Sequence, residues 1–230
     1  MKKLLLSLTV AGALAAVSAQ GQTLIGSGIN NGDFDMDAVG AAPAVWGEAA
    51  SGGSIMVSSA YAQSGSNSLV IDSTGAGAWA SPNAYQLFPA APGDAFNLSG
   101  YMLLPTGAPI TDASFGVLKI EFKDSGGANL EPASIGPGIL DGAGQPFVGA
   151  ISNRVDNTTT TGDWIHAEVG AVAPAGTVEV GFFLLNVNQG DAPSPIHFDS
   201  VTAIPEPATI ALIGGLLALG LVLYRRRKRA

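Results

Sequence analysis

The sequence predicts an all-β protein: an antiparallel β-sandwich of the jelly-roll type, followed by a single C-terminal transmembrane helix. Between residues 20 and 204 there is little helical periodicity. Instead, short runs rich in β-branched and aromatic residues are separated by Gly, Pro, Asn, Asp and Ser, as in antiparallel sheets. Because there are many such runs, two packed sheets are the economical arrangement. An uncharged segment, residues 208–224, comes shortly before the C-terminus and predicts the helix.

Residues 1–19 have the three parts of a secretory signal peptide. Lys2 and Lys3 form a basic start, residues 4–17 form an apolar run, and Val17-Ser18-Ala19 supplies small residues for cleavage. We therefore expect signal peptidase to cut after Ala19, so that Gln20 begins the mature chain. A membrane-spanning first helix is the alternative, but the run is short and no basic residues follow it.

The clearest predicted strand is residues 115–123, where apolar and charged side chains alternate. The apolar members are Leu118, Ile120 and Phe122, and the charged members are Lys119, Glu121 and Lys123. A period of two with one apolar face predicts a half-buried strand. The other predicted strands are 54–59, 68–72, 84–88, 96–104, 164–172, 177–187 and 196–202.

Two of the remaining segments have a distinct place in the predicted sandwich. Residues 177–187 are apolar on both faces, which places this strand in the centre of a sheet. Residues 124–153 are rich in glycine and interrupted by proline, which predicts a long surface insertion, where binding functions are common.

The C-terminal segment combines Pro205-Glu206-Pro207, the uncharged residues 208–224 and the basic residues 225–229. As a helix, residues 208–224 reach about 25 Å, close to the lower limit for crossing a hydrocarbon core about 30 Å thick. The positive-inside rule holds the basic cluster in the cytoplasm and leaves residues 20–204 outside, in agreement with the signal peptide. A buried core helix is the alternative, but it would have to hide the arginines.

This tail resembles the PEP-CTERM sorting signal of Gram-negative bacteria in all three of its parts. These parts are the Pro-Glu-Pro signature, the short helix 208–224 and the terminal basic cluster. The matching residues are Pro205, Glu206, Pro207, Arg225, Arg226 and Arg227. It implies that an exosortase of the inner membrane removes the tail from a membrane-anchored precursor. The mature protein would then reach the cell surface or the extracellular matrix.

The exported part, residues 20–204, is strongly acidic and contains no cysteine. It has three basic residues against seventeen acidic ones, a net charge near −14. Such a surface repels phosphate backbones, which argues against nucleic-acid binding, and it favours solubility or divalent cations. Without cysteine, disulfides and thiolate sites are excluded. The exported part is long enough for one domain with a sizeable core.

Three short motifs make the exported part similar to the galactose-binding-like jelly rolls used as carbohydrate-binding modules. They are Asn30-Asn31-Gly32-Asp33-Phe34-Asp35, Ser64-Gly65-Ser66-Asn67-Ser68-Leu69 and Ile196-His197-Phe198-Asp199-Ser200-Val201. In that family the first and last strands often hold a structural Ca²⁺ ion. The resemblance implies that Asp35 and Asp199 are side-chain ligands and that the turn 64–67 supplies carbonyls. Alternatively, Asp33, Asp35 and Asp37 are ordinary turn residues.

Sugar binding normally uses an exposed aromatic platform beside amide and carboxylate groups, because a pyranose has an apolar face and a ring of hydroxyls. Our candidates for such contacts are Trp79, Tyr85, Gln86 and Tyr101. Trp46 and Trp164 are expected in the core. Since aromatic residues of β-domains usually pack inside, a core role is the alternative for every candidate.

We expect no catalytic site. His166 and His197 have no companion at metal-binding spacing, and neither G-x-S-x-G nor G-x-G-x-x-G occurs. We therefore predict a non-enzymatic surface or matrix protein that binds carbohydrate, such as exopolysaccharide. A structural or adhesive matrix protein without a small ligand is the alternative, and a polysaccharide hydrolase is a more distant one. The glycan, the oligomeric state and release or retention of the mature protein stay open.

Overall fold

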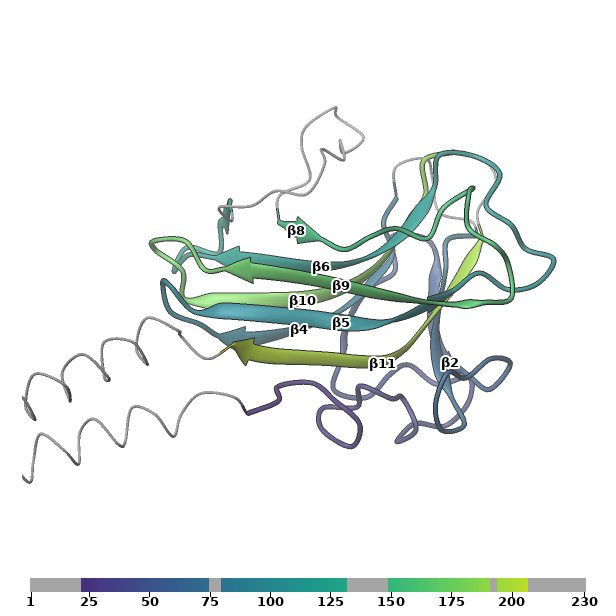
Figure 1. Cartoon of the computed structure of the whole chain (residues 1–230), viewed down its shortest axis with the longest axis horizontal. Helices are drawn as coiled ribbons and strands as arrows, with labels where there is room; N and C mark the ends of the chain where they lie inside the picture. The colour runs from purple at the N-terminus through teal and green to yellow at the C-terminus, as the bar shows by residue number, and fades with distance from the viewer. Residues whose placement is uncertain (1–21, 75–79, 132–148, 191–193, 207–230) are drawn as a thin grey trace, which may run out of the picture.

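Two antiparallel sheets packed face to face make up the computed structural model, which describes residues 22–74, 80–131, 149–190 and 194–206 (Figure 1). Sheet I contains β1 (Gly47–Ala49), β4 (Asn83–Pro89), β10 (Glu179–Val187), β6 (Phe115–Lys123) and β7 (Asn129–Leu130) in that order, and β8 (Ala150–Ile151) also pairs with β6. Sheet II contains β2 (Ser54–Ser58), β3 (Ser68–Asp72), β11 (Pro195–Glu206), β5 (Ala95–Leu103) and β9 (Trp164–Val172) in that order. The predicted all-β class and two-sheet arrangement are confirmed.

All eight predicted strands are present, and β10 lies in the middle of sheet I, as its two apolar faces predicted. Strands β1, β7 and β8 were missed because two or three residues are too few to show a period. β7 and β8 both pair with β6 and fall inside the predicted insertion 124–153, so this region contributes to the sheet at both of its ends.

The core lies between the sheets and is built from alternate residues of the long strands. Phe182 is fully buried and contacts Phe88 of its own sheet and Phe96 of sheet II, with ring centroids 5.8 Å apart in both pairs. Trp46 is also in the core, as expected, whereas Trp164 is half-buried at the start of β9. Burial of these aromatic side chains supplies much of the hydrophobic stabilisation.

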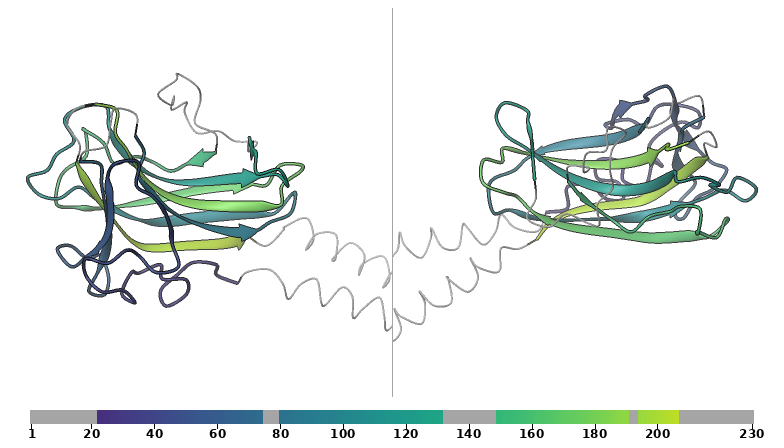
Figure 2. Two further views of the ribbon diagram at one scale, coloured as in Figure 1. Left: turned by 180° about the vertical axis from the view of Figure 1, so that it is seen from behind. Right: turned by 90° about the horizontal axis from the view of Figure 1, so that it is seen from above.

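β11 is paired on both sides along most of its length. β5 flanks one side, while β3 covers the first residues of the other side and the N-terminal segment takes over beyond them. There, Val201 N–H donates to the Gly32 carbonyl (2.8 Å) and Ala203 N–H to the Ile25 carbonyl (3.0 Å). The described chain therefore begins and ends at one end of the sandwich, as Figures 1 and 2 show.

Only part of the predicted sorting tail lies within the described residues. Pro205 and Glu206 form the end of β11, opposite Phe96 and Ala95, so the sandwich continues past residue 204. Ala19, Gln20, Pro207, Arg225, Arg226, Arg227 and the predicted helix 208–224 lie outside them. Within the described ranges, no helix has the length and apolar character needed to cross a membrane.

One expectation about β6 is wrong. The charged face of this strand was predicted to be exposed, but its first eight residues are all buried. Lys119 and Glu121 are only 5% and 8% exposed and form an ion pair with each other. Charged side chains are rarely buried unless paired, and the alternation in the sequence did not reveal this pairing.

The alternation in β10 predicts different stabilities for two adjacent alanine variants. Phe182→Ala should lower the free energy of unfolding by about 3–5 kcal/mol, because it opens a cavity between the sheets. Phe183→Ala, on the half-buried outer face, should cost only about 1–2 kcal/mol. Urea denaturation of the full-length chain would measure both, and equal losses would contradict the register.

Candidate functional site

The outer face of sheet I carries two aromatic side chains in direct contact. Tyr85 of β4 and Phe183 of β10 are cross-strand partners, and their ring centroids are 5.5 Å apart with 28° between the ring planes. Both rings are half-buried, and Leu87, two residues after Tyr85 on the same face, is 39% exposed. Since outer faces of sandwiches are usually polar, this aromatic and apolar surface is unusual.

Two glycines make room for the rings on this face. A Cβ atom at Gly47, the β1 partner of Tyr85, would lie 2.5 Å from Tyr85 Cζ. At Gly181 it would lie 2.5 Å from Phe183 Cε2 and 3.0 Å from Leu87 Cδ2. Each aromatic ring thus lies over a glycine, in space that a side chain at that position would fill. The rings can therefore lie close to the sheet.

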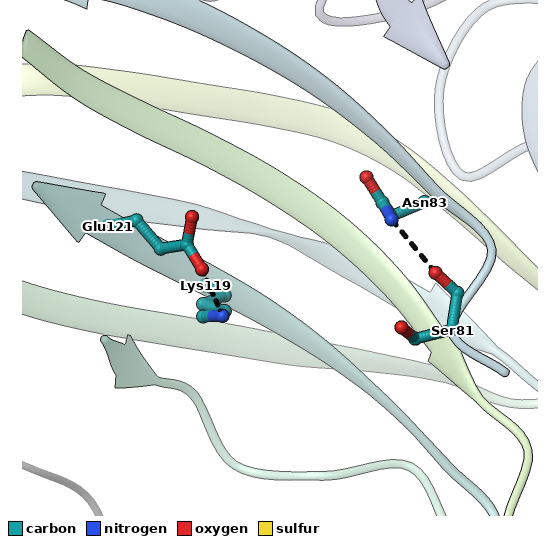
Figure 3. A network of polar contacts seen from close by, with 4 residues as sticks. All are labelled: Ser81, Asn83, Lys119 and Glu121. Atoms are coloured by element: carbon teal, nitrogen blue, oxygen red, sulfur yellow. Dashed lines mark hydrogen bonds and ion pairs between the residues drawn. The ribbon is translucent and has the colours of Figure 1, made fainter. Parts of the chain in front are cut away.

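Charged groups lie beside the aromatic pair. Lys119 Nζ is 5.9 Å from the centroid of the Phe183 ring and forms an ion pair with Glu121, two residues along β6. Figure 3 shows this pair on its strand, together with Asn83, whose side-chain amide donates to the Ser81 carbonyl (2.8 Å). A Cβ at Gly149 would lie 2.8 Å from Lys119 Cε, so the chain before β8 packs over the ion pair.

We call this surface the aromatic face and define it by Asn83, Tyr85, Leu87, Lys119, Glu121 and Phe183. It combines an apolar platform with the half-buried amide of Asn83, and the buried ion pair lies at its edge. An aromatic platform and an amide suit a sugar ring, because its apolar face packs on aromatic carbon and its hydroxyls need donors and acceptors.

The predicted sugar-binding residues do not form one site. Tyr85 belongs to the aromatic face, but Gln86 points to the opposite side of β4, where it is buried and donates to the Asn30 carbonyl (2.7 Å). Tyr101 is half-buried on the outer face of sheet II, where it contacts His166 edge-to-face. Trp79 lies outside the described residues.

Sequence reasoning missed Phe183, Lys119 and Glu121 as members of this face. The signal was available in part, since Phe183 and Leu185 fall between the core residues of β10 and had to face outward. The pairing of β10 with both β4 and β6, which joins Tyr85, Phe183 and Lys119, requires a register that no local pattern contains.

A second cluster joins the two ends of the domain through the turn 63–67. Asp199 accepts hydrogen bonds at Oδ2 from the backbone N–H groups of Gln63 (2.7 Å) and Ser64 (3.0 Å). Asp35 accepts at Oδ1 from the N–H groups of Ser66 (2.8 Å) and Asn67 (3.0 Å). We call this arrangement the end clamp. Both predicted metal ligands therefore hold the same turn, although the turn presents amides to them.

The neighbouring aspartates behave as the alternative interpretation expected. Asp33 accepts hydrogen bonds from Ser27 Oγ (2.6 Å) and Gly28 N–H (3.2 Å), and Asp37 accepts one from Ala44 N–H (3.1 Å). These are contacts within the N-terminal turns. Asp35 differs because its partners are more than thirty residues away in the sequence.

The two clamp carboxylates have different environments. Asp35 is exposed and lies against Gly65, where the positive φ of +63° and the lack of room for a Cβ both require glycine. Asp199 is fully buried beside the bulge at Ser200, and this burial raises its pKa. The N–H donors of Ser64, Gln63 and Ser200 counteract the rise, whereas the negative charge of Asp35 adds to it.

The same loop is fastened to β11 through His197. Ser68 Oγ donates to the Tyr61 carbonyl (2.6 Å) and lies 2.8 Å from His197 Nδ1, so the imidazole carries its proton on Nδ1. The Tyr61 ring packs edge-to-face on His197 with centroids 5.0 Å apart. Burial lowers the pKa of His197 to about 4. In the described part of the chain, no group of three or more His, Asp or Glu side chains is placed to hold a metal ion.

Solved carbohydrate-binding jelly rolls share this fold. The chain is similar to the CBM22-1 xylan-binding domain of Paenibacillus barcinonensis Xyn10C, with 15% identity, 82% of this chain and 98% of that chain covered, and a TM-score of 0.50. It is also similar to part of the arabinose-bound MgGH51 α-L-arabinofuranosidase, with 17% identity, 76% of this chain and 26% of that chain covered, and a TM-score of 0.54. No protein-family model and no curated protein matches the sequence.

The buried imidazole predicts a loss of stability in mild acid. Because the pKa of His197 is 6.5 when unfolded and about 4 when folded, the unfolded chain binds a proton that the native state excludes. This contribution to the free energy of unfolding is fully present above pH 6.5. It falls by up to about 3 kcal/mol as the pH drops towards 4.

Urea denaturation across this pH range would measure the effect. His197→Asn should flatten the decline, while His166→Asn, at an exposed position, should leave it unchanged. The prediction is contradicted if wild type and His197→Asn lose stability in parallel between pH 6.5 and 4.

Proposed function

We propose that the chain is an exported, non-enzymatic protein of the cell surface or matrix that binds polysaccharide on the aromatic face. The single observation that carries the proposal is the contact between Tyr85 and Phe183 on the outside of the sandwich. Aromatic side chains placed there contribute less to the core than inward ones, and they suit a ligand with an apolar face.

The accessible polar group of this face fits a sugar better than an apolar partner. Asn83 is half-buried and supplies a side-chain amide, whereas Lys119 and Glu121 are buried and form an ion pair at the edge of the face. A hydroxyl-rich ligand can hydrogen-bond to the Asn83 amide, whereas an apolar surface would leave it desolvated. The similarity to the xylan-binding domain supports the same ligand class, although at 15% identity it concerns the fold.

The proposal includes the processing that the sequence predicts. Signal peptidase would release residue 20 as the new N-terminus, and an exosortase would act at Pro205-Glu206-Pro207 after insertion of residues 208–224 into the inner membrane. Because Pro205 and Glu206 end β11, the folded domain would include the first two residues of the processing site. A structural matrix role without a sugar ligand is the alternative outcome of the experiment below.

Binding can be tested by pull-down of the full-length chain, in mild detergent, on insoluble xylan, arabinan and cellulose, with polygalacturonate as an anionic comparison. We expect retention on at least one neutral polysaccharide. Tyr85→Ala should weaken this retention roughly three- to tenfold, the loss expected for one aromatic contact. Met36→Ala, at a site 68% exposed in a loop, is the matched control.

Absence of retention on every polysaccharide would contradict the proposed function and favour the structural matrix role. Retention that Tyr85→Ala leaves unchanged would contradict the aromatic face as the site.

We also propose that the end clamp binds a structural Ca²⁺ ion. The negative charge of Asp35 adds to the rise in the pKa of Asp199, and a cation would relieve this repulsion. Further hard oxygen donors are adjacent, since Ser200 Oγ is 2.8 Å from Ser64 Oγ and 2.7 Å from Gln63 Oε1. The backbone amides already bonded to the carboxylates would limit the affinity.

Calcium should raise the melting temperature of the full-length chain, because an ion that binds only the folded state stabilises it by mass action. The stabilisation is about 2.7 kcal/mol at a concentration one hundred times the Kd. Asp35→Asn, which keeps an acceptor for the Ser66 amide, should abolish the shift. Equal melting temperatures in saturating calcium and in chelator would contradict the proposed calcium site.

A further inference from the structure

The outer face of sheet II carries a second group of aromatic and polar side chains, on the opposite side of the sandwich from the aromatic face. The pairing of β5 with β9 aligns Tyr101 with His166, Leu103 with Trp164, and Ser99 with Glu168. We define the β5–β9 face by the outward polar and aromatic members of these rows: Asn97, Ser99, Tyr101, Trp164, His166 and Glu168.

Contacts within the β5–β9 face hold its side chains in place. Tyr101 and His166 pack edge-to-face, with ring centroids 5.1 Å apart and 64° between the planes. The side-chain amide of Asn97 donates to Glu168 Oε1 (2.6 Å). His166 and Glu168 are exposed and Tyr101 and Trp164 are half-buried, so a ligand can reach them.

The end clamp separates this face from the rest of sheet II. Tyr61 covers His197 on β11, and the turn 63–67 is bonded to Asp199, which is the β11 partner of Tyr101. The covered part of β11 therefore ends beside Tyr101, and the β5–β9 face begins there.

From this placement we propose that the β5–β9 face is a second surface for neutral polysaccharide, which makes the domain bivalent. Two aromatic rings offer carbon surface, and an imidazole, an amide, a hydroxyl and a carboxylate offer hydrogen bonds to hydroxyls. An apolar protein partner would bury these polar groups without hydrogen-bond partners. The inference rests on the proposed function, since it assigns the same ligand class to a different surface.

Charge restricts the ligand to neutral sugars. None of the five strands of sheet II contains lysine or arginine, and the β5–β9 face itself contains a carboxylate. Together with a net charge near −14 for residues 20–204, this repels uronic acids and other anions. Two faces on opposite sides of the sandwich can contact different polysaccharide chains, so the protein would cross-link them.

Two measurements on the full-length chain in mild detergent test bivalency: retention on the neutral polysaccharides named above, and turbidity of soluble xylan or arabinan on mixing. Tyr101→Ala and, separately, His166→Ala should each lower retention roughly three- to tenfold. Combination with Tyr85→Ala should multiply the losses. His166 is exposed, so that variant tests binding without risk to the fold. Wild type should raise turbidity, and each single-face variant should bind without raising it.

The outcomes separate this inference from the proposed function. If Tyr101→Ala and His166→Ala match wild type while Tyr85→Ala loses retention, the second face is refuted and the proposed function stands. If Tyr101→Ala loses retention while Tyr85→Ala keeps it, the binding site is on the β5–β9 face and the aromatic face is refuted. If wild type is retained on none of the neutral polysaccharides, both proposals fail.

Discussion

Along the long strands, side chains alternate between the core and the outer face of the sheet, and both the core and the proposed binding surface depend on this alternation. In β10, Phe182 packs between the sheets while its neighbour Phe183 faces outward beside Tyr85. In β6, Leu118 belongs to the core and Lys119 to the outer face. A single strand thus supports both the core and the surface that we propose for binding. The site is built on rigid strands, and its geometry follows from the packing of the core.

In sheet II, the contacts that join the two ends of the domain cover part of β11. β11 is paired with β5 on one side and with β3 and the N-terminal segment on the other. Asp35 and Asp199 reach the same turn from opposite ends of the sequence. This turn covers part of β11 and leaves β5 and β9 open. The end clamp therefore separates the β5–β9 face from the covered part of β11.

Local patterns in the sequence were sufficient for the strands and insufficient for the site. Eight strands, the central place of β10 and the burial of Trp46 follow from periodicity and composition. The pairing of strands does not, so Tyr85 and Tyr101 could not be assigned to opposite sides of the sandwich. Gln86 was predicted as a sugar contact together with Tyr85, although the alternation of β4 places the two side chains on opposite faces. The ion pair of Lys119 with Glu121 was hidden because exposed and paired charges look alike in a sequence.

The most direct test of the aromatic face is fluorine NMR of the full-length chain labelled with fluorotyrosine. The chain has four tyrosines, so each resonance can be assigned by single substitutions to phenylalanine. On titration with a neutral oligosaccharide that the protein binds, the Tyr85 resonance should shift in step with saturation, and that of Tyr61, which packs on His197, should stay in place. Saturation without a change at Tyr85 would contradict the account.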